Sequence, residues 1–107
     1  MSLDVHLMVV QPVSIWSDNV THNLVPMAKA AGIYDAVWRP DEHGLTTAAQ
    51  LIPILEEGIA RLEAEPEKYL ALNPSNGWGS YDDFLPWLKQ YRDACKQNPG
   101  ATVEVSR

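Results

Sequence analysis

The sequence has only one cysteine, Cys95, so no disulfide can form within the chain. A lone cysteine fits a reducing compartment, and a cytoplasmic protein is expected. The first ten residues include Asp4 and His6 and contain neither a basic leader nor a long apolar run. The sequence therefore predicts neither a signal peptide nor a membrane span, and no membrane partner is expected.

Basic residues are also few. Eight Lys and Arg stand against fourteen Asp and Glu, which gives a formal net charge of −6. This balance repels phosphate backbones at long range, so nucleic-acid binding by charge is not expected. The charge would suit a basic partner or a mimic of nucleic acid, although the same magnitude is normal for keeping a small domain in solution.

The sequence also lacks the usual signatures of metal binding and nucleophilic catalysis. His6, His22 and His43 form no His-x-x-x-His pattern and Cys95 stands alone, so neither a metal nor another cofactor is predicted. Cys95 falls on an apolar helical stripe, and we expect it to pack in the core. No nucleophile elbow and no phosphate-binding loop is present. A binding protein is therefore favoured over an enzyme, and no catalytic residue is assigned.

The remaining composition is that of one globular domain. The chain has 107 residues, of which 46% are hydrophobic and 21% are charged. We therefore expect a single domain over residues 1–107. The first expected element is a strand over 3–15, and a helix over about 20–31 follows capping side chains at Ser17, Asp18 and Asn19. After a loop over 33–44, the expected helices run from Thr47 to about Ala64, from Pro66 to about Leu72 and from Ser80 to about Lys96. A strand over 101–106 comes last.

Two terminal strands around a run of helices predict an α+β domain, in which a small sheet of the N- and C-terminal strands packs against three to four helices. Residues 5–9 are expected to pair with residues 101–105, with the helices over 51–62 and 84–95 packed on that sheet. Both faces of the first strand are largely apolar, so cover on more than one side is expected. Because two strands make a marginal sheet, we expect either a third strand over 13–16, folded back as a hairpin, or pairing across a homodimer.

Two prolines complicate the helices. Pro26 fits only if its helix begins near Asn23, because proline is tolerated in the first turn of a helix. Pro53 lies deeper in its helix, so a kink or a shifted start is expected there. The helix over 47–64 nevertheless has the clearest pattern, since Thr47 and Gln50 have the spacing of a capping box.

The first candidate site is the polar segment that follows Trp16. It includes Asn19, Thr21, His22 and Asn23, whose side chains can donate and accept hydrogen bonds to a polar ligand. The alternative is that these side chains serve only helix capping and turns.

The second candidate site is the segment Asn73-Pro-Ser-Asn-Gly-Trp-Gly-Ser-Tyr81. Its glycines allow close approach of a ligand to the backbone, Asn76 adds a carboxamide, and Trp78 or Tyr81 can supply a stacking face. The alternative is a rigid turn in which Trp78 fills the core and Ser80 caps the next helix.

We predict that the two candidate segments lie side by side and form one concave polar surface. Each carries a large aromatic residue, Trp16 in the first and Trp78 in the second, whose indole N–H needs a polar partner. Trp38 and Arg39 are added from the loop between the first two helices, where Arg39 would supply a positive charge for an anionic group. Hydrogen bonds between the two turns would satisfy the same side chains without any ligand.

Four segments of the chain, Asn19-Val-Thr-His-Asn23, residues 31–39, Asn73-Pro-Ser-Asn-Gly-Trp-Gly79 and residues 94–99, together resemble a family of small uncharacterised proteins from bacteriophages, prophages and bacteria. The similarity runs from about Trp16 to the C-terminus. Members with Tyr in place of His22 imply that His22 is not an obligatory proton carrier or metal ligand. The resemblance implies an accessory or host-interaction role and transfers no catalytic residue.

Two functional classes are favoured, and an enzyme remains as a third, less favoured class. The first is a binding module for a polar or nucleotide-like ligand, which rests on two Asn-rich turns with nearby aromatic residues. The second is an acidic protein-interaction or inhibitory accessory that acts on a host protein. A pocket lined by Asn19, Asn23 and Trp78 would favour the first class, and a flat apolar dimer or partner face would favour the second.

Overall fold

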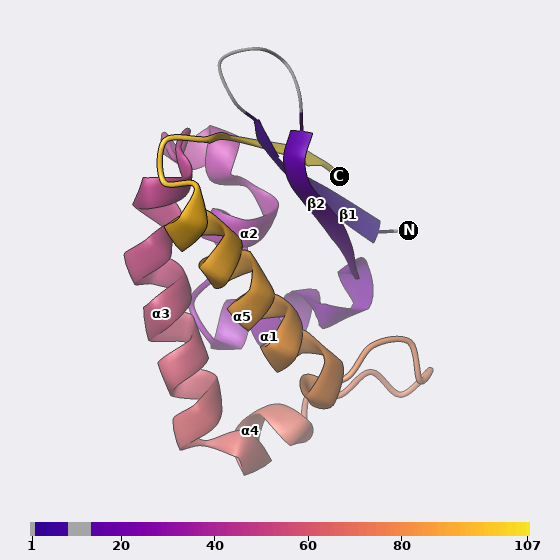
Figure 1. Ribbon diagram of the computed structural model, residues 1–107. Helices are drawn as coiled ribbons and strands as arrows, with labels where there is room; N and C mark the ends of the chain where they lie inside the picture. Colours follow the sequence, from indigo (N-terminus) through magenta and orange to yellow (C-terminus); the bar gives the residue numbers. More distant parts are fainter. Residues whose placement is uncertain (1, 9–13) are drawn as a thin grey trace.

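The computed structural model describes residues 2–8 and 14–107, and Figure 1 shows their arrangement. In chain order the elements are β1 (Ser2–Met8), β2 (Ser14–Thr21), the 3-10 helix η1 (His22–Leu24), α1 (Val25–Ala30), α2 (Tyr34–Trp38), the 3-10 helix η2 (Pro40–His43), α3 (Ala48–Ala64), α4 (Pro66–Leu70), α5 (Tyr81–Gln97) and β3 (Thr102–Ser106). The predicted α+β class is confirmed, with one antiparallel sheet beside a layer of helices.

Strand β1 is the centre of the sheet, with β2 on one side and β3 on the other. It pairs antiparallel with both, and Val5 lies opposite Val105 in β3. The predicted pairing of the terminal strands is therefore confirmed for the described residues, and Val9 of that prediction lies outside them. The hairpin alternative is also confirmed, although β2 extends to Thr21, and Val13 of the predicted third strand is not described.

The length of β2 corrects the predicted start of the first helix. Ser17, Asp18 and Asn19 lie in the middle of β2 and do not cap a helix, because the segment is extended and pairs in register with β1. Helix α1 begins only at Val25, which places Pro26 in its first turn, as the chemistry of proline requires.

One face of β1 is fully packed and the other is not. Leu3, Val5 and Leu7 are completely buried, whereas the alternate side chains, such as Asp4 and His6, are only half-buried. The expected cover on both faces is thus incomplete. A face of the sheet with mainly polar side chains remains open to solvent.

Helix α5 contacts β2 of the sheet, and α3 packs against α5 and runs beside it in the opposite direction (Figure 1). The predicted capping box is present at the start of α3, where the Gln50 side chain accepts the Thr47 N–H at 3.1 Å. Ser80 caps α5 by accepting the Asp83 N–H at 3.2 Å. Pro53 does not shift the start of α3, which begins at Ala48.

Helix α2 was not expected, because residues 33–44 have the composition of a loop. Its five residues are too few for a helical periodicity to be recognised, and burial of Ala36, Val37 and Trp38 stabilises it. Helix α4 begins at Pro66 as predicted and ends at Leu70, two residues before the predicted end. Among the described residues, no helix has the length and hydrophobicity needed to cross a membrane.

A row of aromatic rings connects α2, α5 and β2 through the core. Successive rings lie 5.2–6.4 Å apart between centroids, in the order Tyr34, Trp38, Phe84, Trp87, Tyr91 and Trp16. The last pair is stacked, with 9° between the ring planes. Such contacts add to the burial of apolar area and fix β2 against α5.

Replacing Leu55 by Ala is expected to lower the free energy of unfolding by about 2–5 kcal/mol, because Leu55 is fully buried and the core cannot fill the whole cavity. Denaturant unfolding followed by circular dichroism measures the change. Leu70→Ala is the matched control, since Leu70 is 41% exposed and should lose less than about 1 kcal/mol. Equal losses in the two variants would contradict this assignment of the core.

Candidate functional site

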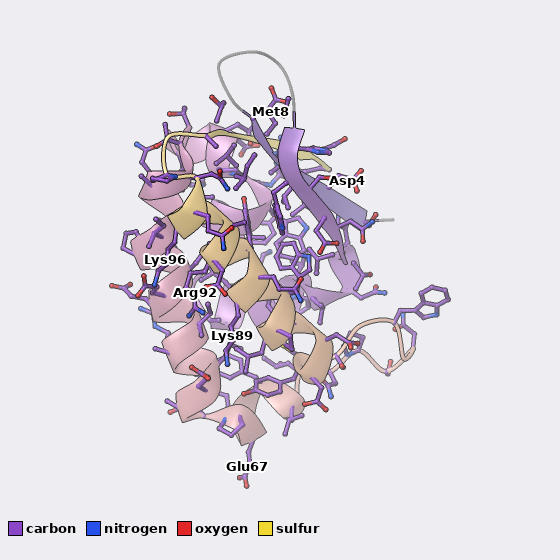
Figure 2. The ribbon with its side chains drawn as sticks, viewed as in Figure 1. Asp4, Met8, Glu67, Lys89, Arg92 and Lys96 are labelled. Carbon is purple, nitrogen blue, oxygen red and sulfur yellow. The ribbon has the colours of Figure 1, made fainter. Side chains whose placement is uncertain are left out.

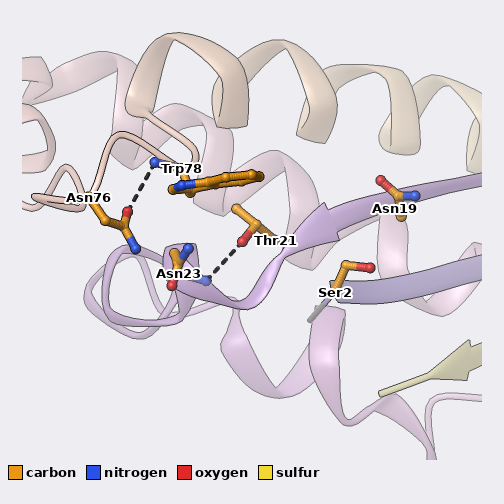
Figure 3. A pocket seen from close by; sticks show the side chains of 6 residues that line it. All are labelled: Ser2, Asn19, Thr21, Asn23, Asn76 and Trp78. Atoms are coloured by element: carbon orange, nitrogen blue, oxygen red, sulfur yellow. Dashed lines mark hydrogen bonds between the residues drawn. The ribbon is translucent and has the colours of Figure 1, made fainter.

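A polar hollow of about 500 Å³ lies where the end of β2 meets the loop before α5 (Figure 3). The side chains that line it are Ser2, Asn19, Thr21, Asn23, Asn76 and Trp78. The two segments singled out from the sequence are thus side by side, as predicted. Whether the hollow binds a ligand stays a prediction.

Asparagine side chains and glycines shape the loop over residues 73–80. The Asn73 Oδ1 accepts the Tyr81 N–H at 2.8 Å, and the Asn76 Oδ1 accepts the Trp78 N–H at 3.0 Å. Gly77 and Gly79 have positive φ angles of 76° and 92°, which favour glycine. The loop is therefore held by its own hydrogen bonds, and Asn73 has a structural role.

Gly79 allows the loop to lie directly against the end of β2. A Cβ atom on Gly79 would lie 2.6 Å from Cγ2 of Thr21 and 3.2 Å from Cγ of Leu24. Real Cβ atoms do not approach carbon atoms so closely, so any side chain at this position would push the loop away. The absence of a side chain at Gly79 thus brings the two walls of the hollow together.

The described residues of the lining supply hydrogen-bonding groups and carry no charge. The carboxamides of Asn19 and Asn23 are exposed and make no hydrogen bond to another described residue, so each offers two donors and an acceptor. The amide N–H groups of Asn76 make no hydrogen bond to a described residue, since only its oxygen is engaged. Thr21 accepts the Asn23 N–H at 3.3 Å, which ties the floor of the hollow to η1.

Trp78 is the most unusual side chain of the hollow, because 71% of its surface is exposed. Figure 3 shows the indole extending over Thr21, with the carboxamides of Asn23 and Asn76 nearby. The alternative in which Trp78 fills the core is therefore wrong. A large exposed aromatic face among hydrogen-bonding groups is typical of a surface that stacks on a ligand.

Four residues predicted for the site lie outside the lining. Trp38 is buried in the core, and Tyr81 is buried with its hydroxyl donating to the Leu62 carbonyl at 2.8 Å. Arg39 donates to the Tyr34 hydroxyl at 3.0 Å and pairs with Glu42, so it does not supply a charge to the hollow. These contacts, with the Tyr34 hydrogen bond first among them, raise the pKa of Arg39.

His22 is the fourth of these residues. It lies between Thr21 and Asn23 in sequence, but its ring is 6.3 Å from the Trp38 ring, between centroids. Its Nε2 atom is buried and has no hydrogen-bond partner among the described residues. The turn of η1 therefore separates His22 from its two polar neighbours.

Trp16 and Ser2 also differ from the prediction. Trp16 stacks on Tyr91 and is part of the aromatic row, so only one of the two expected indoles borders the hollow. Ser2 borders the hollow and was not predicted. The hairpin register could have indicated this position, because it places Ser2 opposite Thr21.

Comparisons with protein-family models, with curated proteins and with solved structures each find no match for this chain. Any functional statement therefore rests on the residues of the hollow and on the surface around it.

Other reactive groups do not form a second centre in the described part of the chain. No three His, Cys, Asp or Glu side chains among the described residues lie together in a way that could hold a metal ion. His43 pairs with Asp35 at 3.4 Å on the surface. Cys95 is buried, which confirms its predicted place in the core, and this burial raises the pKa of its thiol to about 12.

The Trp78→Ala variant is expected to keep the stability of the parent protein within about 0.5 kcal/mol, because the exposed indole contributes little to the core. Trp38→Ala, the matched buried substitution, should cost about 3–5 kcal/mol, since Trp38 is only 2% exposed. Thermal and denaturant unfolding of the two variants measure both effects. A large loss of stability in Trp78→Ala would show that the indole is part of the scaffold.

Cys95 is expected to resist thiol reagents in the folded protein. A pKa near 12, against 9.0 for a free thiol, leaves about a thousandfold less thiolate at pH 8, and burial also blocks access. Absorbance after addition of an aromatic disulfide follows the reaction, and the same protein in denaturant is the control. Modification at equal rates in both conditions would contradict this placement of Cys95.

Proposed function

We propose that the protein is a binding module for an uncharged polar ring compound of the nucleobase or nucleoside type, held in the hollow beside Trp78. The observation that carries this proposal is the exposed indole, which borders the same hollow as the carboxamides of Asn19, Asn23 and Asn76. This combination offers a flat apolar face and several hydrogen-bonding groups within one hollow. No catalytic step is proposed.

Stacking supplies the first part of the binding energy. A base that stacks on an aromatic side chain gains about 1–3 kcal/mol. The backbone of Trp78 is already fixed, since its N–H donates to Asn76 and its neighbours Gly77 and Gly79 hold defined turns. A ligand therefore orders little of the loop when it binds, which reduces the entropic cost of association.

Hydrogen bonding supplies the selectivity. A carboxamide can donate and accept in one plane, and Asn commonly pairs in this way with the N6 and N7 edge of adenine. The Asn23 and Asn19 carboxamides have both functions unused by other described residues. Ser2 and Thr21 add hydroxyl groups that suit a ribose or a second polar edge.

The charge of the lining argues for a nucleoside over a nucleotide. None of the six lining residues is charged, and Arg39 is engaged by Tyr34 and Glu42 outside the hollow. A phosphate placed here would lose hydration and gain no cation from the described lining, in a chain with a net charge of −6. The part of a nucleotide-like ligand that fits is thus its base and sugar.

Titration of the protein with adenosine, guanosine, cytidine, uridine and adenosine monophosphate tests the proposal. Isothermal calorimetry and the fluorescence of Trp78 should detect at least one nucleoside, with adenosine favoured by the amide geometry and the monophosphate weaker. Trp78→Ala and Asn23→Ala should each weaken binding by about tenfold, because each removes about 1–2 kcal/mol of contact. Gln90→Ala is the matched control, since Gln90 is an exposed carboxamide on α5 away from the hollow.

Two results would contradict the proposal. The first is the absence of binding by every nucleoside while native mass spectrometry of protein purified from its host also shows no retained small molecule. The second is binding that Gln90→Ala weakens as much as Asn23→Ala does. If the resemblance to phage and prophage proteins holds, the module would serve as an accessory that recognises such a molecule in a host cell.

A further inference from the structure

The two outer edges of the sheet differ in how far other residues of the chain cover them. The edge of β3 is partly covered, since the Val103 N–H donates to the Thr46 carbonyl at 2.9 Å and Thr47 forms a bridge with Thr102. The described part of the chain places no strand on the outer edge of β2. Eight residues of strand, Ser14–Thr21, therefore end the sheet on that side.

The middle of β2 is exposed on both of its faces. Ser17 and Asn19 are exposed on the open face of the sheet, and Asp18 is exposed although its register partner Val5 is fully buried. Successive side chains of a strand point to opposite faces of the sheet, and all three of these are exposed. The edge formed by β2 therefore lies at the surface of the protein. The Asn19 N–H donates to Asp18 Oδ1 at 2.8 Å, so a carboxylate occupies one backbone donor of the strand.

Natural proteins protect an edge strand with a short length, a bulge, proline or charged side chains, lysine above all. A negative charge such as Asp18 repels acidic edges but attracts a cationic segment. Residues 14–21 contain neither Lys nor Pro, and the only charged side chain among them is Asp18. An edge of this length and composition can accept an extended segment of another chain through backbone hydrogen bonds.

The charge distribution indicates what kind of segment fits. None of the three strands contains Lys or Arg, whereas Asp4, Asp18 and Glu104 lie in them. These three carboxylates form no ion pair with a described Lys or Arg. Much of the excess negative charge of the protein is thus placed on the sheet.

The cations of the protein lie on other elements and are neutralised there. Seven of them are within 4 Å of an acidic side chain, namely Arg39, Arg61, Lys68, Lys89, Arg92, Lys96 and Arg107. Figure 2 shows Lys89, Arg92 and Lys96 along α5, with Asp4 on the other side of the view. The sheet therefore presents uncompensated negative charge to a partner.

We propose that the outer edge of β2 is the docking edge for an extended segment of another protein that carries Lys or Arg, and that this segment adds to the sheet as a fourth strand. Backbone hydrogen bonds along residues 17–20 supply the alignment, and a cation of the segment pairs with Asp18. A cation near Asp18 would also release the Asn19 N–H, which then donates to the partner backbone.

A second copy of this chain is a poorer occupant of the same edge. Two β2 strands side by side would bring two acidic edges together, including Asp18 of both copies, with no Lys or Arg on either strand. Like charges on adjacent strands are destabilising. A partner of opposite charge meets no such repulsion.

The test uses the isotope-labelled full chain and two peptides of the length of β2, one alternating Lys with Thr and one alternating Glu with Thr. Nuclear magnetic resonance titration should show that the basic peptide shifts the amide signals of residues 16–20 and that the acidic peptide does not. Asp18→Lys should weaken binding of the basic peptide by about tenfold or more, since it reverses the charge at the edge. Raising the salt concentration from roughly 0.02 to 0.5 M should weaken it as well.

Glu67→Lys is the matched control, because Glu67 is an exposed acid on α4 that forms no ion pair with a described residue. It makes the same change in net charge away from the sheet and should leave binding within about twofold. The proposal is overturned if the two charge reversals weaken binding equally, or if the shifted signals lie on the helices. It is also overturned if the chain alone forms a dimer through β2 at the concentrations used.

Discussion

The arrangement of the whole protein depends on the pairing of β1 with a neighbour on each side. A two-stranded hairpin is marginal in water, so β1 and β2 need the C-terminal strand and the helices to become stable. The pairing of Val5 with Val105 joins the N-terminal and C-terminal strands. Strand β1 also buries Leu3, Val5 and Leu7 against the helices. Because β2 follows β1 in register up to Thr21, the same pairing decides where β2 ends and the hollow begins.

A second constraint completes the hollow. Thr21 ends β2, and the loop that carries Trp78 reaches it only because Gly79 has no side chain. The two long helices bring this loop there, since α5 starts directly after it and Ser80 and Tyr81 anchor its end. The surface formed in this way has a simple electrostatic division, with a neutral hollow at one end of β2 and uncompensated acids along the sheet.

Much of this fold could be predicted from the sequence, and the failures have identifiable causes. Helices α3 and α5 have long apolar stripes and clear caps, so local signals suffice. The segment 17–19 resembles a helix cap because Ser, Asp and Asn favour caps and turns, but pairing with β1 overrode that local preference. The juxtaposition at the hollow could be inferred from two Asn-rich segments. Tertiary packing determines the burial of Trp38 and Tyr81 and the orientation of His22, so a local sequence pattern could not predict them.

The proposed docking edge and the proposed ligand site share strand β2, and this shared strand gives the two sites a physical connection. Asn19 lines the hollow through its side chain and belongs to the docking edge through its backbone. A strand added beside β2 would restrict the backbone of Asn19 and Thr21 and so order the β2 wall of the hollow before a ligand arrives. A ligand that binds after the added strand does not have to order β2 again, so the bound segment should raise the affinity for the ligand. The ligand should raise the affinity for the segment by the same factor, because the coupling free energy is the same in both directions. The two proposals therefore place the hollow and the sheet edge in one recognition surface built on a single strand.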